Sequence, residues 1–178
     1  LWTLPMFHCN GWCFTWAIGA AGGTHVCLRT VDPGQIWRLL RQEGITHFSA
    51  APTVLTMLAE HADARPLDSR VHVDTGGAPP SPALLERMDS LGLDITHLYG
   101  LTETYGPSVI NDWNRDWDGL SSSDYAAKKA RQGVPYVVLE DMTVMDPETM
   151  QRVPADGVTL GEVMMRGNVV MKGYLKNR

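Results

Sequence analysis

Apolar and polar positions up to Tyr99 alternate between the spacing of strands and the spacing of helices. Four short apolar runs are typical of strands, and each of the first three is followed by a segment with a helical stripe. The predicted strands are His25–Leu28, Thr46–Ala50, Val71–Asp74 and Ile95–Tyr99. Because strands that alternate with helices are joined by right-handed crossovers, the pattern predicts an α/β fold with a mostly parallel sheet covered by helices.

The helices between these strands have recognisable start and stop signals. Asp32 is a typical N-cap, Pro33 suits the first helical position, and Gln35 follows the cap by three residues. Gly44 suits the end of this helix. Similar signals predict one helix over Pro52–Glu60 and another from Ser81 to Gly92.

The pattern changes after residue 110. Asp112–Asp124 is polar and aperiodic, which predicts a long ordered loop. From Gly133 onward, short runs separated by turn residues such as Asp146-Pro147 predict an antiparallel, barrel-like segment. These runs are Tyr136–Leu139, Thr143–Met145 and Glu162–Arg166. We therefore divide the chain into an α/β portion over 1–110, a loop region over 111–132 and a β-rich portion over 133–178.

Composition and charge narrow the class of protein. The chain has 178 residues, 44% hydrophobic and 20% charged, which is ordinary for a globular protein with one sizeable core. The net charge of -5 argues against nucleic acid as a partner. We interpret the densest basic cluster, Lys128-Lys129 with Arg131, as a solvated face.

The cysteines and the longest apolar stretch bear on the compartment. Cys9, Cys13 and Cys27 are odd in number and form no Cys-x-x-Cys pair, so neither a disulfide framework nor a zinc site is indicated. The apolar stretch from Cys13 to Gly23 is about half the roughly 20 residues that span a bilayer. We therefore predict a cytoplasmic protein without a transmembrane segment.

Candidate chemistry lies at the ends of two predicted strands. Tyr99, Thr102 and Glu103 offer a ring that can stack on a base, a hydroxyl for a phosphate oxygen and a carboxylate for Mg²⁺. A strand end followed by a helix-capping Thr would give the same spacing. Gly76-Gly77 follows the preceding strand, where glycines admit a close ligand or simply form a turn. Because both segments follow strand ends, we expect them to face one crevice.

Four segments resemble motifs of one family, in that family's order. Tyr99-Gly100-Leu101-Thr102-Glu103-Thr104 resembles the central motif of the adenylate-forming (AMP-binding) superfamily of acyl-CoA synthetases, luciferases and peptide-synthetase adenylation domains. The other matching segments are Leu4-Pro5-Met6-Phe7-His8-Cys9-Asn10-Gly11-Trp12, Gly76-Gly77-Ala78-Pro79, and Gly161-Glu162-Val163 with Arg166-Gly167 and Lys172-Gly173-Tyr174. The fatty-acyl-CoA synthetase branch is the best fit.

The resemblance implies a role for each matched residue. Tyr99 stacks on adenine, Thr102 contacts the α-phosphate, Glu103 ligates Mg²⁺, and His8 lies near the substrate carboxylate. Trp12 matches a ring that gates the acyl tunnel, although a Trp at a helix start is also a routine packing residue. The implied catalytic residues are Thr102, Glu103 and His8. The implied nucleotide contacts are Gly76, Gly77, Ala78, Pro79, Tyr99, Gly100, Leu101 and Thr102, and the implied acid contacts are His8, Trp12 and Gly100.

The implied reaction activates a carboxylic acid, medium- or long-chain by the Trp12 match, with ATP and transfers it to coenzyme A. Two alternatives stay open: a domain that loads a carrier protein, and a non-catalytic module that binds nucleotide or acyl ligand. The family's phosphate loop, its Tyr-Arg-Thr-Gly-Asp segment and its C-terminal catalytic Lys have no match in these residues. We therefore expect the chain to be an internal portion of a large N-terminal domain, inactive by itself.

Overall fold

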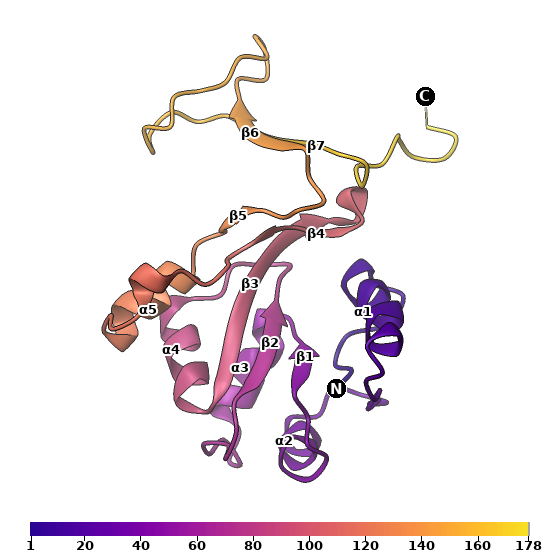
Figure 1. The fold of residues 1–178 in the computed structure, drawn as a ribbon, viewed down its shortest axis with the longest axis vertical. Helices are drawn as coiled ribbons and strands as arrows, with labels where there is room; N and C mark the ends of the chain where they lie inside the picture. Colours follow the sequence, from indigo (N-terminus) through magenta and orange to yellow (C-terminus); the bar gives the residue numbers. More distant parts are fainter. Residues whose placement is uncertain (178) are drawn as a thin grey trace.

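A five-stranded sheet with helices against it forms the body of the structure, and a two-stranded sheet lies beyond it (Figure 1). The computed structural model describes residues 1–177, apart from the side chains of Cys9, Asn10, Trp12 and Cys13. The helices are α1 Cys9–Ala20, α2 Pro33–Gln42, α3 Pro52–Glu60, α4 Pro82–Ser90 and α5 Ser122–Lys129, with short 3-10 turns η1 Thr102–Thr104 and η2 Arg115–Trp117. The strands are β1 His47–Ser49, β2 Val71–Thr75, β3 Leu93–Leu101, β4 Gly106–Ile110, β5 Val134–Pro135, β6 Asp141–Met145 and β7 Glu162–Arg166.

The strand order explains why the ends of β2 and β3 are neighbours. In the large sheet the order is β1-β2-β3-β4-β5. β1, β2 and β3 are parallel, whereas β4 runs antiparallel to β3 and β5 runs antiparallel to β4. The predicted α/β class with a parallel sheet and covering helices is confirmed, and two antiparallel strands complete the sheet.

The core lies between the sheet and the helices α2, α3 and α4. Along β2 and β3 alternate side chains are buried, as a strand with one covered face requires. Trp37 of α2 is fully buried, and its indole N–H donates to the Leu58 carbonyl of α3 at 3.1 Å. Each fully buried aliphatic side chain in such a core stabilises the fold by about 1.5–3 kcal/mol.

The N-terminal segment extends the sheet beyond β1. The amino group of Leu1 donates to the His47 carbonyl at 2.8 Å, and the Trp2 N–H donates to the Val26 carbonyl at 2.8 Å. The predicted strand His25–Leu28 therefore exists only as a single parallel bridge between Trp2 and Cys27. Residues 25–28 have described backbone contacts only with the N-terminal segment, and these backbone bonds are too few for a full strand.

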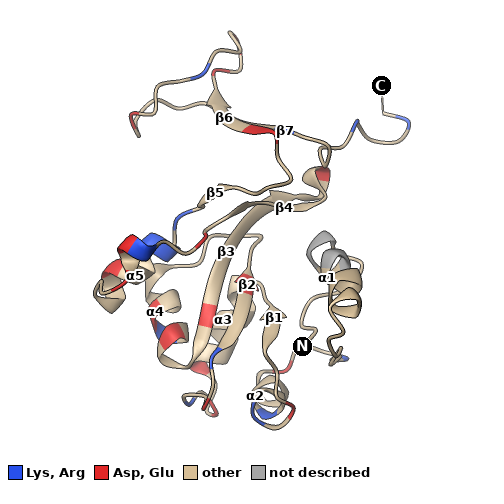
Figure 2. Ribbon diagram, in the orientation of Figure 1, with Lys and Arg blue, Asp and Glu red and all other residues tan. Residues whose placement is uncertain are grey.

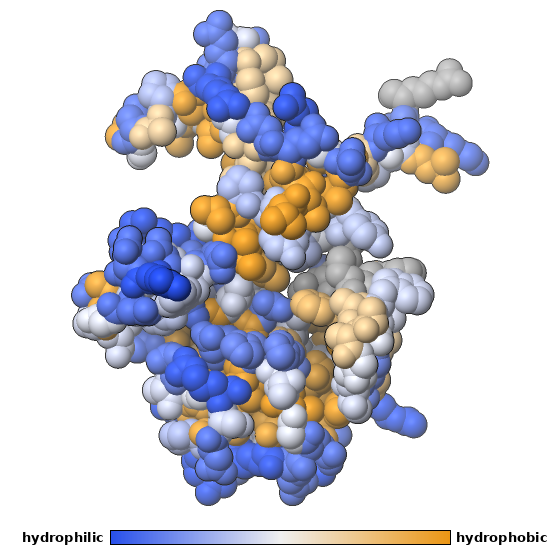
Figure 3. All heavy atoms as spheres, viewed as in Figure 1, coloured by the Kyte–Doolittle hydropathy of each residue, from blue (hydrophilic) through white to orange (hydrophobic). Residues whose placement is uncertain are grey.

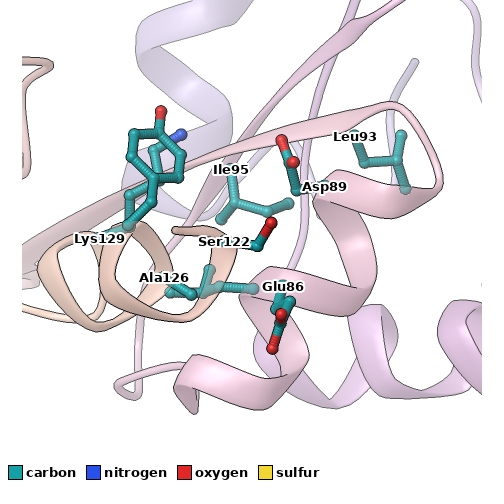
Figure 4. A pocket seen from close by; sticks show the side chains of 9 residues that line it. Glu86, Asp89, Leu93, Ile95, Ser122, Ala126 and Lys129 are labelled. Carbon is teal, nitrogen blue, oxygen red and sulfur yellow. The ribbon is translucent and has the colours of Figure 1, made fainter. Parts of the chain in front are cut away.

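The predicted loop over 112–124 is wrong at its end, because α5 begins at Ser122. Ser121 caps this helix by accepting from the Asp124 N–H at 3.2 Å. α5 packs against α4 with Ala126 turned toward the core (Figure 4). Only Ala126 and Lys129 of this short helix are buried, so the sequence carries no apolar stripe.

Lys129 also corrects the interpretation of the basic cluster as a solvated face. Its side chain is 11% exposed, its ammonium donates to Asp94 of β3, and the ammonium lies 5.1 Å from the centre of the Tyr125 ring. The pair ties α5 to the sheet, because a buried ammonium needs a charged partner. Acidic and basic positions are mixed on α5 (Figure 2).

In the C-terminal portion the antiparallel pairing is confirmed for β6 and β7. The predicted strand Tyr136–Leu139 is wrong: pairing ends at Pro135, and the Leu139 N–H closes a turn onto the Tyr136 carbonyl at 3.0 Å. The Tyr136 N–H makes a last bond to β4, to the Ser108 carbonyl at 2.8 Å, before this turn. Within residues 133–177, β6 and β7 form a two-stranded sheet that does not close into a barrel. Apolar surface is exposed where this portion meets the body of the structure (Figure 3). Highly exposed apolar side chains of this portion include Val137, Val158, Leu160 and Leu175.

A cavity of about 620 Å³ lies between α1 and the β1 side of the sheet. Phe14 and Ile18 of α1 and Val26 and Phe48 give it mostly apolar walls. Asp74, near the end of β2, also lines this cavity, and burial raises its pKa to about 6, with His72 opposing the shift. Glu43 is the other carboxyl group of the lining, and it is exposed, so Asp74 is the carboxyl group that the cavity holds away from water.

We expect Gly100→Ala to destabilise the fold by about 1–3 kcal/mol. A Cβ at this position would lie 2.0 Å from the Gly106 carbonyl oxygen, so β3 and β4 would have to separate. Gly19→Ala in α1 is the matched control, because a Cβ there meets nothing within 4 Å and alanine favours a helix. In urea unfolding, the midpoint concentration should be lower than that of native protein for Gly100→Ala and unchanged or higher for Gly19→Ala. Equal midpoints for the two variants would contradict the close approach of β3 and β4.

We expect Asp74→Asn to remove a pH-dependent loss of stability. Because the folded-state pKa of about 6 is above the ordinary value of 3.8, the folded protein binds this proton more tightly than the unfolded chain. Stability of the native protein should therefore fall as the pH rises from about 4 through about 6. At pH 7 the variant should be more stable by up to about 3 kcal/mol. Unfolding measured across this pH range checks it, with exposed Asp68→Asn as control; parallel curves for native protein and Asp74→Asn would contradict the assignment.

Candidate functional site

The central site segment lies at the end of β3, where the sheet changes from parallel to antiparallel. The predicted strand Ile95–Tyr99 is too short at both ends: β3 begins at Leu93 and continues to Leu101, and Gly100 pairs with Pro107 of β4. A bulge lies between Tyr99 and Gly100, and Ser108 is the extra residue of β4 at that point. The lack of a Cβ at Gly100 is what lets β4 come this close. The strand pairing therefore requires a glycine at position 100, whether or not Gly100 also contacts a ligand.

The turn itself is η1, and Thr104 holds it together. The buried Thr104 hydroxyl accepts from the Leu101 N–H at 3.0 Å and donates to the Gly106 carbonyl at 3.0 Å. Tyr105 follows in the left-handed region with φ 58°, which reverses the chain into β4. Thr102 and Leu101 are exposed at this turn, whereas Glu103 is partly exposed. Sequence reasoning did not assign Thr104; its signal is a hydroxyl two residues before the glycine that starts β4.

The Gly76–Pro79 loop lies beside the end of β3. Thr75 pairs with His97, and a Cβ at Gly76 would lie 3.0 Å from the Leu98 carbonyl oxygen. Gly77 has φ +85°, a conformation that favours glycine. Ala78 and Pro79 are exposed. The structure therefore brings the two predicted segments together at one sheet edge, while the nucleotide contacts of each residue stay a prediction.

Glu103 is held by the C-terminal portion of the chain. The Tyr174 hydroxyl donates to Oε1 of Glu103, and the Met171 N–H donates to the Glu103 carbonyl at 2.8 Å. The bond from Tyr174 lowers the pKa of Glu103, helped by the backbone N–H of Glu103, and it raises the pKa of Tyr174. Glu103 is thus kept ionised.

This donor set is compatible with Mg²⁺. In proteins Mg²⁺ is bound through one or two carboxylates together with substrate phosphates, so it needs no all-protein cage. A carboxylate has roughly four acceptor positions, of which Tyr174 takes one on Glu103. No group of three His, Cys, Asp or Glu side chains in the described part of the chain could enclose a metal. Glu103 would hold the ion only with a nucleotide present.

His8 lies at the N-cap of α1 and is exposed, so it is not a residue of the core. The chain folds back before it: the His8 N–H donates to the Pro5 carbonyl at 3.1 Å, and a Cβ at Gly11 would lie 2.5 Å from the same oxygen. α1 contacts β4, which brings the first segment toward the Tyr99–Glu103 turn. The side chain of Trp12 lies outside the described residues, so its gating role stays a prediction.

The crevice beside α5 and the cavity beside α1 differ greatly in volume. The crevice between α4 and α5, lined by Glu86, Asp89 and Lys129 among others, has a volume of about 10 Å³, enough for about one water (Figure 4). The cavity beside α1 is about 620 Å³, within the usual range of ligand pockets. Within residues 1–177 no helix is long and apolar enough to cross a membrane.

Known proteins share both the sequence and the fold. The chain is 51% identical to an acetate–CoA ligase of Humulus lupulus over 180 residues, which cover 99% of this chain and 32% of the relative. It is 48% identical to a peroxisomal acetate/butyrate–CoA ligase of Arabidopsis thaliana, again over 99% of this chain and 32% of the relative. The chain thus spans about a third of the length of the curated relatives it matches.

The fold of the chain is similar to that of a solved coenzyme A synthetase structure. The o-succinylbenzoate coenzyme A synthetase of Bacillus subtilis, in complex with ATP and magnesium ion, superimposes with a TM-score of 0.78 at 25% identity. The match covers 99% of this chain and 34% of that chain. The model of the AMP-binding enzyme family matches residues 1–175. The chain therefore belongs to the AMP-binding enzyme family.

Proposed function

We propose that this chain is part of an ATP-dependent acid–CoA ligase, and that the Tyr99–Glu103 turn beside the Gly76-Gly77 loop binds its nucleotide. The observation that supports this most is their adjacency: Tyr99 lies in the last residues of β3, Thr102 and the ionised Glu103 follow that strand, and the glycine loop follows its parallel neighbour β2. In open α/β sheets, ligands bind in the crevice at the carboxyl ends of the strands. The relatives' names as CoA ligases favour coenzyme A over a carrier protein as acceptor.

In the proposed reaction an oxygen of the substrate carboxylate attacks the α-phosphorus of ATP and pyrophosphate leaves. The thiolate of coenzyme A then attacks the acyl carbon, and AMP leaves. Tyr99 would stack on adenine, Thr102 would donate to an α-phosphate oxygen, and His8 would orient the acid. Mg²⁺, when bound at Glu103, would neutralise phosphate charge. The residues of this chain therefore contribute positioning and charge stabilisation.

The whole protein carries the proposed activity, since the chain matches only about a third of its relatives. Inactivity of the 178 residues by themselves stays a prediction, and it rests on the missing match to a phosphate loop and a catalytic Lys. A cytoplasmic location also stays a prediction, and the Arabidopsis relative is named peroxisomal.

Glu103→Gln in the full-length protein should reduce acid-dependent pyrophosphate exchange about tenfold or more, because the neutral amide cannot offset phosphate charge. Folding should change little, since Glu103 lies partly exposed at the turn. Pyrophosphate exchange with ATP and a thermal unfolding midpoint measure the two effects. Glu86→Gln, an exposed glutamate of α4, is the matched control. Exchange equal to the control's would refute the metal role.

The acid is proposed to be medium- or long-chain, because the cavity beside α1 is apolar and holds far more than an acetyl group. A second candidate is a short acid, which the acetate and acetate/butyrate relatives favour. A series of straight-chain acids from acetate to laurate separates them by kcat/KM for CoA ester formation. We expect a maximum beyond butyrate, shifted by Trp12→Ala. A maximum at acetate that Trp12→Ala leaves in place would select the second candidate.

A further inference from the structure

The contact between Tyr174 and Glu103 joins two segments that are 71 residues apart. The C-terminal segment holds Glu103 twice, through the Met171 N–H on its backbone and the Tyr174 hydroxyl on its carboxylate. Between them Gly173 has φ +148°, a conformation that side chains rarely adopt, and it turns the chain into Tyr174. These contacts fix both ends of one residue.

Packing does not account for Tyr174. The residue is 58% exposed, so the ring buries little apolar surface, and the bond to Glu103 is the one hydrogen bond described for its hydroxyl. A glutamate at a partly exposed turn otherwise samples several rotamers, and ordering it on binding a cation costs free energy. A donor that already orients the carboxylate removes part of that cost.

We infer that Tyr174 is a positioning residue that holds the Glu103 carboxylate in the orientation in which it receives the divalent cation of the nucleotide. The inference rests on the proposed function. It adds that the portion after residue 133 takes part in the nucleotide site, although the implied nucleotide and metal residues all lie at or before Glu103. The hydroxyl takes one acceptor position, and the remaining positions of the carboxylate face the cation.

The test uses Tyr174→Phe in the full-length protein, which removes the hydroxyl and keeps the ring. Calorimetric titration of Mg²⁺ into the protein with a non-hydrolysable ATP analogue should show a Kd about threefold to tenfold higher than native, the range for one solvent-exposed bond to a charged group. In pyrophosphate exchange the half-saturating Mg²⁺ concentration should rise similarly, while the rate at saturating Mg²⁺ changes little. Tyr136→Phe, at an exposed tyrosine of the same portion, is the control and should match native protein.

A second step separates positioning through Glu103 from a structural role. In a Glu103→Gln background, Tyr174→Phe should cause no further change in the Mg²⁺ Kd, because the carboxylate it orients is gone. An undiminished loss in that background would show that Tyr174 acts elsewhere and would overturn the inference. So would an unchanged Kd for Tyr174→Phe while Glu103→Gln alone weakens Mg²⁺ binding. If Glu103→Gln alone has no effect on Mg²⁺, the proposed metal role fails, and this inference fails with it.

Discussion

The close pairing of β3 with β4 is the constraint on which the site depends. β3 has β2 on one side and β4 on the other, and at Gly100 the two backbones approach until no Cβ fits between them. The same strand pair carries the bulge at Tyr99 and the turn at η1, and this turn places the Glu103 backbone a few residues further on. The carboxylate lies where it does because a strand reverses there, and a buried threonine hydroxyl closes that reversal.

The two sides of the sheet have different tasks. One side packs against α2, α3 and α4 in a continuous apolar core, which supplies the stability of the body. The other side carries polar positions such as His72 and Asp94, together with the cavity beside α1. In α/β enzymes the helices usually pack against the sheet to form the core, and ligands bind at the carboxyl ends of the strands. The C-terminal portion adds little to the core; it is joined to β4 through β5, and it holds Glu103 by a pair of bonds.

Local signals in the sequence predicted most of the body. The cap at Asp32, the prolines at the starts of α2 and α4 and the alternation along β2 and β3 act within a few residues, so they are legible without the fold. The failures involve partners far along the chain. α5 is stabilised by Lys129 bonding to Asp94 on β3, and no periodicity in its own residues reveals that. Likewise, the residues around Tyr174 give no sign in the sequence that its hydroxyl bonds to Glu103, 71 residues earlier.

The fit at Gly100 has a consequence for how such sequences are compared across evolution. If the glycine of the Tyr-Gly pair is needed for two strands to meet, selection for folding alone retains it in descendants that no longer turn over any acid. Its presence then reports ancestry, and catalytic competence has to be judged from neighbours that the backbone tolerates losing. Thr102 and Glu103 are of that kind, because Thr102 is exposed, Glu103 is partly exposed, and neither belongs to the buried core.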